Sequence, residues 1–143
     1  MRVLVTGSRT WSERVVLEIA VLAEVLGVTP REVTLVHGAC GEGADRIADA
    51  FARRRGWVTE PHPADWARHG TQAAGPVRNQ RMVDLGADVC VAFVRDRSRG
   101  ATGTVRMARK AGIRTVVWRH EADRVWLDPY GVEAEPAQQG ALF

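Results

Sequence analysis

The stretch at residues 33–45, Val33-Thr34-Leu35-Val36-His37-Gly38-Ala39-Cys40-Gly41-Glu42-Gly43-Ala44-Asp45, decides the fold. Its first four residues form the apolar run of a buried strand, and the residues after the glycines continue in a helical pattern. A strand that ends at glycines and restarts as a helix leaves backbone N–H groups and a helix N-terminus directed at one spot, which favours phosphate. The stretch therefore predicts a strand–loop–helix unit with an anion-binding loop.

Outward from this unit, short apolar runs alternate with amphipathic segments. Strands are predicted at residues 3–5, 34–36, 57–60, 88–93 and 114–118, with an edge strand within 121–128. Helices are predicted at residues 15–26, 44–55, 75–85 and from Thr102 or Thr104 to 111, and residues 61–70 are expected to be irregular. This alternation implies right-handed crossovers, and hence an α/β, Rossmann-like three-layer fold with a mostly parallel sheet of five or more strands.

The first predicted helix is amphipathic by its spacing. Thr10 or Ser12 is expected to cap it, and its apolar positions are Val15, Val16, Ile19, Leu22, Ala23 and Leu26. Gly27 ends it.

Composition indicates one compact domain. The chain has 143 residues, of which 45% are hydrophobic and 26% charged. We expect a domain over residues 1–130 and a polar tail over 131–143. No stretch approaches about 18 consecutive apolar residues, and the N-terminus enters a strand directly, so we predict neither a signal peptide nor a membrane span and expect a cytoplasmic protein. Two cysteines and four histidines show no disulfide or metal spacing, so no metal and no cofactor are predicted.

Charge alone says little about partners. The formal net charge is +3, and most of the basic residues are arginines. The planar guanidinium suits phosphate and carboxylate recognition, yet arginine is equally common on solvated surfaces.

Three loops follow predicted strands and carry glycine together with hydroxyl or guanidinium groups, at residues 6–9, 37–45 and 98–104. In an open parallel sheet, ligands bind outside the carboxyl ends of the strands, so these loops are expected to share one site. None of them has the spacing of the dinucleotide fingerprint or the P-loop, which disfavours a classical dehydrogenase or nucleoside triphosphatase. The candidate ligand-binding residues are Gly7, Ser8, Arg9, Gly38, Ala39, Gly43, Asp45, Asp65, Trp66, Arg78, Asn79, Ser98, Gly100, Thr102, Gly103 and Thr104.

The motifs together resemble the SLOG superfamily, in its YspA, cpYpsA-related branch, over residues 1–118. The resemblance is carried by the segments at 5–9, 37–45, 62–66, 75–79, 86–88 and 98–104. It implies a Rossmannoid fold that binds nucleotides or nucleotide-derived ligands, and an assembly of two or more copies. The superfamily includes ligand sensors and the Lonely Guy phosphoribohydrolases, which cleave the N-glycosidic bond of nucleoside monophosphates.

The hydrolase comparison fails at one position. These enzymes use an arginine in a helix, which Arg78 resembles, and a glutamate three residues after a Gly-Thr pair, which here is Gly103-Thr104. The third residue after that pair is Met107, and a thioether cannot supply the carboxylate that an oxocarbenium-like transition state requires. Hydrolysis would need Glu42, Asp45 or Asp65 as a replacement.

Several candidate side chains have a structural alternative. Asp45 can complement a helix dipole or contact a ligand, and Asp65 can hold a turn or bind a ribose hydroxyl. His37 and His62 are candidate general acids or bases, because the ordinary pKa of histidine lies near neutrality, but such histidines are more often structural. Trp66 can stack on a base.

Arg78-Asn79, after Gly75-Pro76 near a helix start, is the basic element best suited to phosphate, because a guanidinium and helix N-terminal amides give bidentate contacts. We expect Arg78→Ala to weaken nucleotide binding by about tenfold or more with little change in the thermal melt.

The last five residues suggest a separate partner. Gln139, Leu142 and Phe143 are similar to the peptide with which bacterial polymerases and repair proteins engage the sliding clamp, although Gly140 departs from the usual leucine.

Two main functions compete at this stage. One is a binding module, a sensor or sequestering protein, for a nucleoside monophosphate, NAD or an ADP-ribose-like ligand. The other is a nucleotide N-glycosidase or related transferase, whose catalytic candidates are Asp45, Asp65 and Arg78. A nucleic-acid-associated protein recruited to the clamp is a third.

Overall fold

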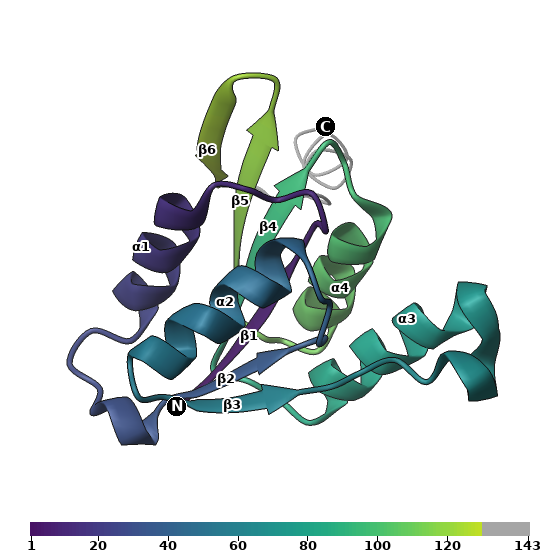
Figure 1. Cartoon of the computed structure of the whole chain (residues 1–143), viewed down its shortest axis with the longest axis horizontal. Coiled ribbons are helices and arrows are strands. Elements are labelled where there is room, and N and C mark those ends of the chain that lie inside the picture. The colour runs from purple at the N-terminus through teal and green to yellow at the C-terminus, as the bar shows by residue number, and fades with distance from the viewer. Residues whose placement is uncertain (130–143) are drawn as a thin grey trace, which may run out of the picture.

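The structure, a computed structural model, describes residues 1–129. Six strands form one sheet in the order β3-β2-β1-β4-β5-β6 (Figure 1). The first five strands in this order run parallel, and β6 runs antiparallel to β5. The elements are β1 (Arg2–Gly7), α1 (Arg14–Glu24), a 3-10 turn (Pro30–Glu32), β2 (Thr34–His37), α2 (Gly43–Arg54), β3 (Val58–Pro61), α3 (Trp66–Asp84), β4 (Val89–Arg95), α4 (Arg99–Lys110), β5 (Thr115–Glu121) and β6 (Arg124–Asp128).

The sheet is the middle of three layers. Because side chains alternate across a strand, Val3 and Val5 of β1 join a core with Leu17 of α1 and Ala48 of α2, whereas Leu4 packs with Met82 of α3 on the opposite face. Strands buried on both faces read as continuous apolar runs, as β4 does. The expected α/β, Rossmann-like, mostly parallel architecture is thereby confirmed.

β1 occupies the middle of the parallel strands, and this placement creates the site. The chain leaves β1 through α1 to reach β2 on one side, and returns through α3 to β4 on the other side. The loops after β1 and β4 therefore diverge, and a crevice opens at the carboxyl ends of these strands.

Helix α3 begins earlier than the sequence indicates. It starts at Trp66, inside the segment expected to be irregular, and consists of two helical pieces joined at Gly70, whose φ is 78° and ψ 174°. Pro63, Gly70 and Pro76 all predict breaks, but Asp65 caps the first piece by accepting a hydrogen bond from the N–H of Arg68 at 3.0 Å. The tertiary fold thus keeps a helix that local propensity disfavours.

Helix α1 departs from expectation in its cap and in its buried face. Its N-cap is Glu13, and neither Thr10 nor Ser12 provides a side-chain cap. The buried positions are Leu17, Ala20 and Val21, and Val16 and Leu22 of the predicted stripe are partly buried against the core. The other predicted positions on the helix, Val15, Ile19 and Ala23, are exposed, and Leu26 lies beyond the end of α1. The helix has two apolar faces, so periodicity alone could not select the inner one.

No helix within residues 1–129 is long and apolar enough to cross a membrane. The clamp-type residues Gln139, Leu142 and Phe143, and the tail expected at 131–143, lie outside the described residues.

Candidate ligand-binding cleft

An open cleft of about 540 Å³ lies at the carboxyl ends of β1, β2 and β4, where the sequence predicts the site. A second hollow of about 550 Å³ adjoins it, and the two share Arg9, Gly38, Cys40, Trp66 and Arg78. The residues expected from sequence that line one or both hollows are Gly7, Ser8, Arg9, Gly38, Ala39, Asp45, Trp66, Arg78, Asn79, Ser98, Gly100 and Gly103. The three glycine-containing loops do converge.

Two glycines allow the loop after β1 to lie directly on the start of α2. A Cβ on Gly7 would collide with Ala44, and a Cβ on Gly43 would collide with the backbone of Ser8 and Arg9. Gly43 also has a φ of +69°, which L side chains rarely adopt. The carbonyl oxygen of Ser8 accepts a hydrogen bond from the N–H of Ala44 at 3.2 Å, so the β1 loop caps α2.

Ser8 joins the loop after β1 to the end of β4. Its side chain is buried, and its hydroxyl accepts from the N–H of Arg95 at 2.8 Å and donates to the carbonyl oxygen of Arg95 at 3.3 Å. Both hydrogen bonds are internal, so this hydroxyl fixes the geometry of the cleft.

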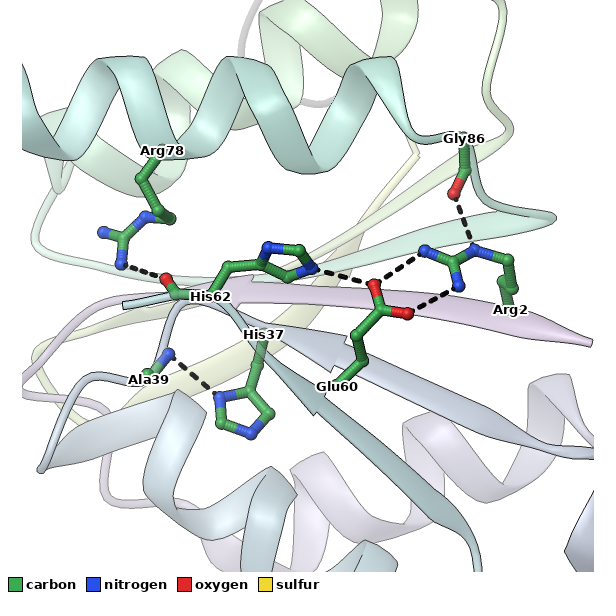
Figure 2. A network of polar contacts seen from close by, with 7 residues as sticks. All are labelled: Arg2, His37, Ala39, Glu60, His62, Arg78 and Gly86. Carbon is green, nitrogen blue, oxygen red and sulfur yellow. Dashed lines mark hydrogen bonds and ion pairs between the residues drawn. The ribbon is translucent and has the colours of Figure 1, made fainter. Parts of the chain in front are cut away.

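The glycine loop after β2 is held by two side chains of the chain itself. Nδ1 of His37 accepts a hydrogen bond from the N–H of Ala39 at 3.0 Å (Figure 2), and Oδ2 of Asp45 accepts one from the N–H of Cys40 at 3.2 Å. Because Nδ1 is an acceptor, Nε2 of His37 carries the proton that it shares with Asp49 at 2.9 Å. His37 therefore has a structural role, and the N–H groups of Ala39 and Cys40 are not free for phosphate.

Asp45 is a buried carboxyl group that borders the cleft. Burial raises its pKa, and the hydrogen bond from the N–H of Cys40 and the positive charge of Arg78 act in the opposite direction. The side chain thus organises the loop while placing an acidic group in the wall of the site.

Arg78 crosses the cleft from α3 to the loops after β2 and β3. Its Nη1 donates to the carbonyl oxygen of His62 (Figure 2). The same Nη1 donates to the carbonyl oxygen of Gly38, and Nε donates to Oδ1 of the buried Asn79. A Cβ on Gly38 would lie 2.7 Å from Nη1, so only glycine leaves room for this crossing. Arg78 therefore connects α3 to the loops after β2 and β3, and it also lines the cleft.

Two guanidinium groups stand close together at the junction of the two hollows. Burial lowers the pKa of Arg78, Asp45 and Cys40 oppose that shift, and the positive charge of Arg9 lowers the pKa further. Arg9 is exposed and lines both hollows. Like charges placed together repel one another, and an anion bound between them would relieve that repulsion.

A chain of ion pairs holds the loop after β3. Arg2 makes a bidentate contact with Glu60 at 2.8 and 2.9 Å, and Glu60 pairs with Nε2 of His62 at 2.8 Å (Figure 2). The hydrogen bonds from Arg2 and His62 lower the pKa of Glu60 to about 2. The imidazole of His62 is therefore held by Glu60, and this contact fixes the backbone of His62. The carbonyl oxygen of that backbone accepts the hydrogen bond from Nη1 of Arg78.

Helix α4 presents an uncapped N-terminus to the cleft. The side chain of Ser98 makes no cap, the first turn carries no acidic residue, and Arg99 stands there instead. Within residues 1–129, the N–H groups of residues 99–101 have no hydrogen-bond acceptor, and all three residues line the cleft. Open amides, a helix dipole and a guanidinium are together suited to an anion.

Some predicted residues take structural positions. Asp65 caps α3, the hydroxyl of Thr102 donates to the carbonyl of Ser98, and that of the fully buried Thr104 donates to the carbonyl of Gly100. None of these three side chains lines the cleft, and Gly43 serves the contact between β1 and α2.

Four polar or charged residues that the sequence did not predict for the site also line the cleft: Thr10, Arg95, Asp96 and Arg99. Asp96 and Arg97 have φ values of 50° and 57°, and such a left-handed pair of non-glycine residues directly after a buried strand is costly. The sequence signal that could have identified Arg95 and Asp96 is their position at the end of the predicted strand, where ligands bind in parallel sheets.

Met107 lines the cleft, at the position where the hydrolases carry their glutamate. Asp45 and Asp96 are the carboxylates that border the main hollow within residues 1–129, and Glu42 borders the second.

A sequence profile of the YspA, cpYpsA-related SLOG family matches residues 1–69. The "Gene 61 protein" of Mycobacterium phage D29 is 47% identical over 117 residues, which cover 78% of this chain and 91% of that protein. No solved structure matches the chain. The match with the phage protein extends well beyond residue 69, so the likeness includes loops from both halves of the cleft.

Proposed function

The chain belongs to the YspA, cpYpsA-related SLOG family, part of a nucleotide-related superfamily, and from that premise we propose that its cleft binds a phosphorylated, nucleotide-derived ligand. The observation that carries the proposal is the open N-terminus of α4, which faces the same hollow as Arg9 and Arg78. Amide donors, a positive helix end and two guanidinium groups suit a phosphate or diphosphate.

The two adjoining hollows favour a ligand in which a central diphosphate joins two nucleoside or sugar groups. Arg9, Arg78 and Trp66 stand where the two hollows meet. A diphosphate beside the guanidinium groups would leave one nucleoside or sugar in each hollow, with the half-exposed indole of Trp66 available for stacking on a base. We therefore expect ADP-ribose or NAD to bind more tightly than a nucleoside monophosphate.

Binding without hydrolysis is the better-supported activity. Met107 removes the carboxylate with which the phosphoribohydrolases stabilise positive charge on the ribose, and Asp65 caps a helix outside the cleft. The protein would act as a sensor or a sequestering module.

Asp45 supports the alternative, a nucleotide N-glycosidase or related transferase, because it is a buried acidic group in the cleft wall. Its carboxylate would have to stabilise the developing oxocarbenium ion in place of the missing glutamate. Its hydrogen bond with the N–H of Cys40 favours the structural role.

The decisive experiment combines calorimetry and chromatography. AMP, GMP, CMP, ADP-ribose and NAD are titrated into the protein, and each mixture is then analysed for free base. Saturable binding with intact ligand supports the binding module, and base release that disappears in Asp45→Asn supports the hydrolase. Failure of all five compounds to bind would contradict the proposal.

A further inference from the structure

Positive charge gathers on one side of the sheet. α3 and α4 cover the side opposite to α1 and α2 (Figure 1). Together α3 and α4 carry seven arginines and lysines and one acidic residue, Asp84. Their net charge is therefore +6, whereas that of the whole chain is +3, so all other residues together sum to −3. The basic character of the protein comes from this pair of helices.

The two sides of the sheet treat their arginines differently. On the side of α1 and α2, Glu18 pairs with both Arg14 and Arg54. α4 carries no acidic residue, and within residues 1–129 no ion pair involves Arg99 or Lys110. The positive charge of α4 is therefore not balanced by carboxylates of its own helix.

The cations of α4 form a line along the helix. Arg99, Arg106 and Lys110 follow one another at intervals of seven and four residues, which places them on one helical face, called here the basic face. A rise of about 1.5 Å per residue gives this face a length of about 16 Å. The helix dipole favours cations in the last turn, where Arg109 and Lys110 lie, but it does not account for Arg99 in the first turn. Arg106 and Lys110 are like charges one turn apart, an arrangement that destabilises a helix unless an anion lies across it.

Gly103 lies between Arg99 and Arg106 on the basic face. A Cβ at position 103 would meet nothing within 4 Å, so no contact inside the protein requires glycine there. Glycine in the interior of a helix is destabilising relative to alanine. The missing side chain leaves the helix backbone open to close approach by a partner from outside.

An open hollow of about 790 Å³ adjoins the basic face between α3 and α4. Within residues 1–129 its lining includes three cations and no carboxylate: Gln80, Arg106, Met107, Arg109, Lys110 and Ala111. Arg109 thus adds a fourth cation beside the line. A surface rich in guanidinium groups and free of carboxylates suits phosphate.

The residues of α4 distinguish among anionic partners. α4 buries Ala101, Val105 and Ala108 in the protein, so its outer face offers little apolar surface to a lipid bilayer or to the core of a protein interface. α4 contains no aromatic residue, so it provides no platform on which unstacked bases of a single strand could lie. A line of cations without such groups matches the phosphates of a duplex.

We propose that the basic face of α4, together with Arg109, binds the phosphate backbone of a nucleic-acid duplex without reading its bases. Arg99 and Gly103 also border the cleft, whereas Arg106, Arg109 and Lys110 do not. The duplex site thus extends away from the cleft, and duplex binding does not depend on the ligand proposed above.

Fluorescence anisotropy with a labelled DNA duplex of about 20 base pairs tests the proposal. The dissociation constant is expected to be on the order of micromolar at about 50 mM salt. A plot of the logarithm of the binding constant against that of the salt concentration should have a slope of about −3 to −4, because each phosphate neutralised contributes about −0.9. Arg106→Ala and Lys110→Ala should each make this slope shallower by about one. The matched control is Arg46→Ala, which removes the same charge from an exposed position on α2 and should leave the slope unchanged.

Further measurements separate the alternatives. Absence of duplex binding, or a slope that Arg106→Ala and Lys110→Ala change no more than Arg46→Ala does, would overturn the proposal. Tighter binding of a single strand of the same length would assign the face to unstacked bases, and tighter binding of poly-glutamate would assign it to an acidic protein. Calorimetry with ADP-ribose on Lys110→Ala distinguishes the duplex site from the cleft, because any affinity of the wild type for ADP-ribose should be retained. A loss of that affinity would show that the basic face is part of the cleft.

Discussion

Arg78 rests on the backbone of Gly38, and the two residues are 40 positions apart in the sequence. Nη1 of Arg78 donates to the carbonyl oxygen of Gly38, and a Cβ at position 38 would lie 2.8 Å from the guanidinium carbon. This contact fixes the distance between α3 and the glycine loop, and it makes both residues part of one structural unit.

Gly38→Ala should displace the guanidinium of Arg78 from the loop. We expect a loss of about 1–3 kcal/mol in the free energy of unfolding, which is typical of overpacking, and weaker binding of the tightest ligand in the panel. Urea denaturation and calorimetry measure the two effects. If Gly38→Ala binds and unfolds like the wild type, Arg78 does not depend on this contact.

Gly43→Ala should destabilise the fold more than any other glycine substitution in the same loop. The new Cβ would meet the backbone of Ser8 and Arg9 at a φ of +69°, so strain and overpacking combine to about 2–4 kcal/mol. Gly41→Ala is the control, because a Cβ at position 41 meets nothing within 4 Å. Equal urea midpoints for the two variants would refute the close packing of α2 on the β1 loop.

Arg9→Ala and Arg78→Ala should separate binding from stability. Both should weaken ligand binding by about tenfold or more, because each removes a charge-assisted contact to phosphate. Arg9 is exposed, and no hydrogen bond holds its side chain within residues 1–129, so Arg9→Ala should leave the thermal melt unchanged. Arg78→Ala should also lower the melting temperature, contrary to the expectation from sequence, because it frees the carbonyls of Gly38 and His62. Calorimetry and thermal melts on both variants check these outcomes.

Ser8→Ala should cost about 1–3 kcal/mol of stability. The substitution leaves the N–H of Arg95 without its acceptor, while the carbonyl of Arg95 keeps the hydrogen bond from the N–H of Ser98. Ser98→Ala is the control, since the side chain of Ser98 makes no cap at α4. Indistinguishable unfolding of the two variants would argue against a structural role for Ser8.

Glu60→Gln should destabilise the protein at pH 7 and not near pH 2. The hydrogen bonds from Arg2 and His62 depress the pKa of Glu60 to about 2 in the folded state, below its ordinary value near 4.5. A depressed pKa contributes stability that is fully present above the unfolded pKa and is lost as the pH falls through the folded value. The stability gap between wild type and Glu60→Gln should therefore be constant from pH 7 to 5 and shrink from about pH 4.5 toward 2. Urea denaturation at pH 7, 5 and 3 measures it, and a gap that widens at pH 3 would contradict the assignment.

The fold could be predicted because its signals are local. The run Val89–Phe93 and the alternation of strands with helices indicated a parallel sheet, and the structure confirms it. The break at Gly70 and the cap at Asp65 could not be predicted, because tertiary contacts decide whether a segment rich in glycine and proline remains helical.

The candidate site was predicted in outline only. Loop position predicted that Arg9 and Gly38 lie near one another, since the carboxyl ends of parallel strands meet at one edge. Arg78 was predicted separately, from its place after Gly75-Pro76 near a helix start. Loop position did not predict whether a hydroxyl group points into the cleft or into the protein. Ser8 and Thr104 turn inward to satisfy backbone groups, and a sequence does not show which buried donors and acceptors lack partners.

The glycine loop has one further consequence for how a ligand would arrive. His37 and Asp45 hold the amides of Ala39 and Cys40, so the loop does not have to fold around an incoming molecule. A preorganised wall lowers the entropic cost of association, which favours rapid capture with little movement of the backbone. We therefore expect any structural response to binding to arise elsewhere in the cleft. The first turn of α4, whose N–H groups would donate to a bound anion, is the part whose order binding would change.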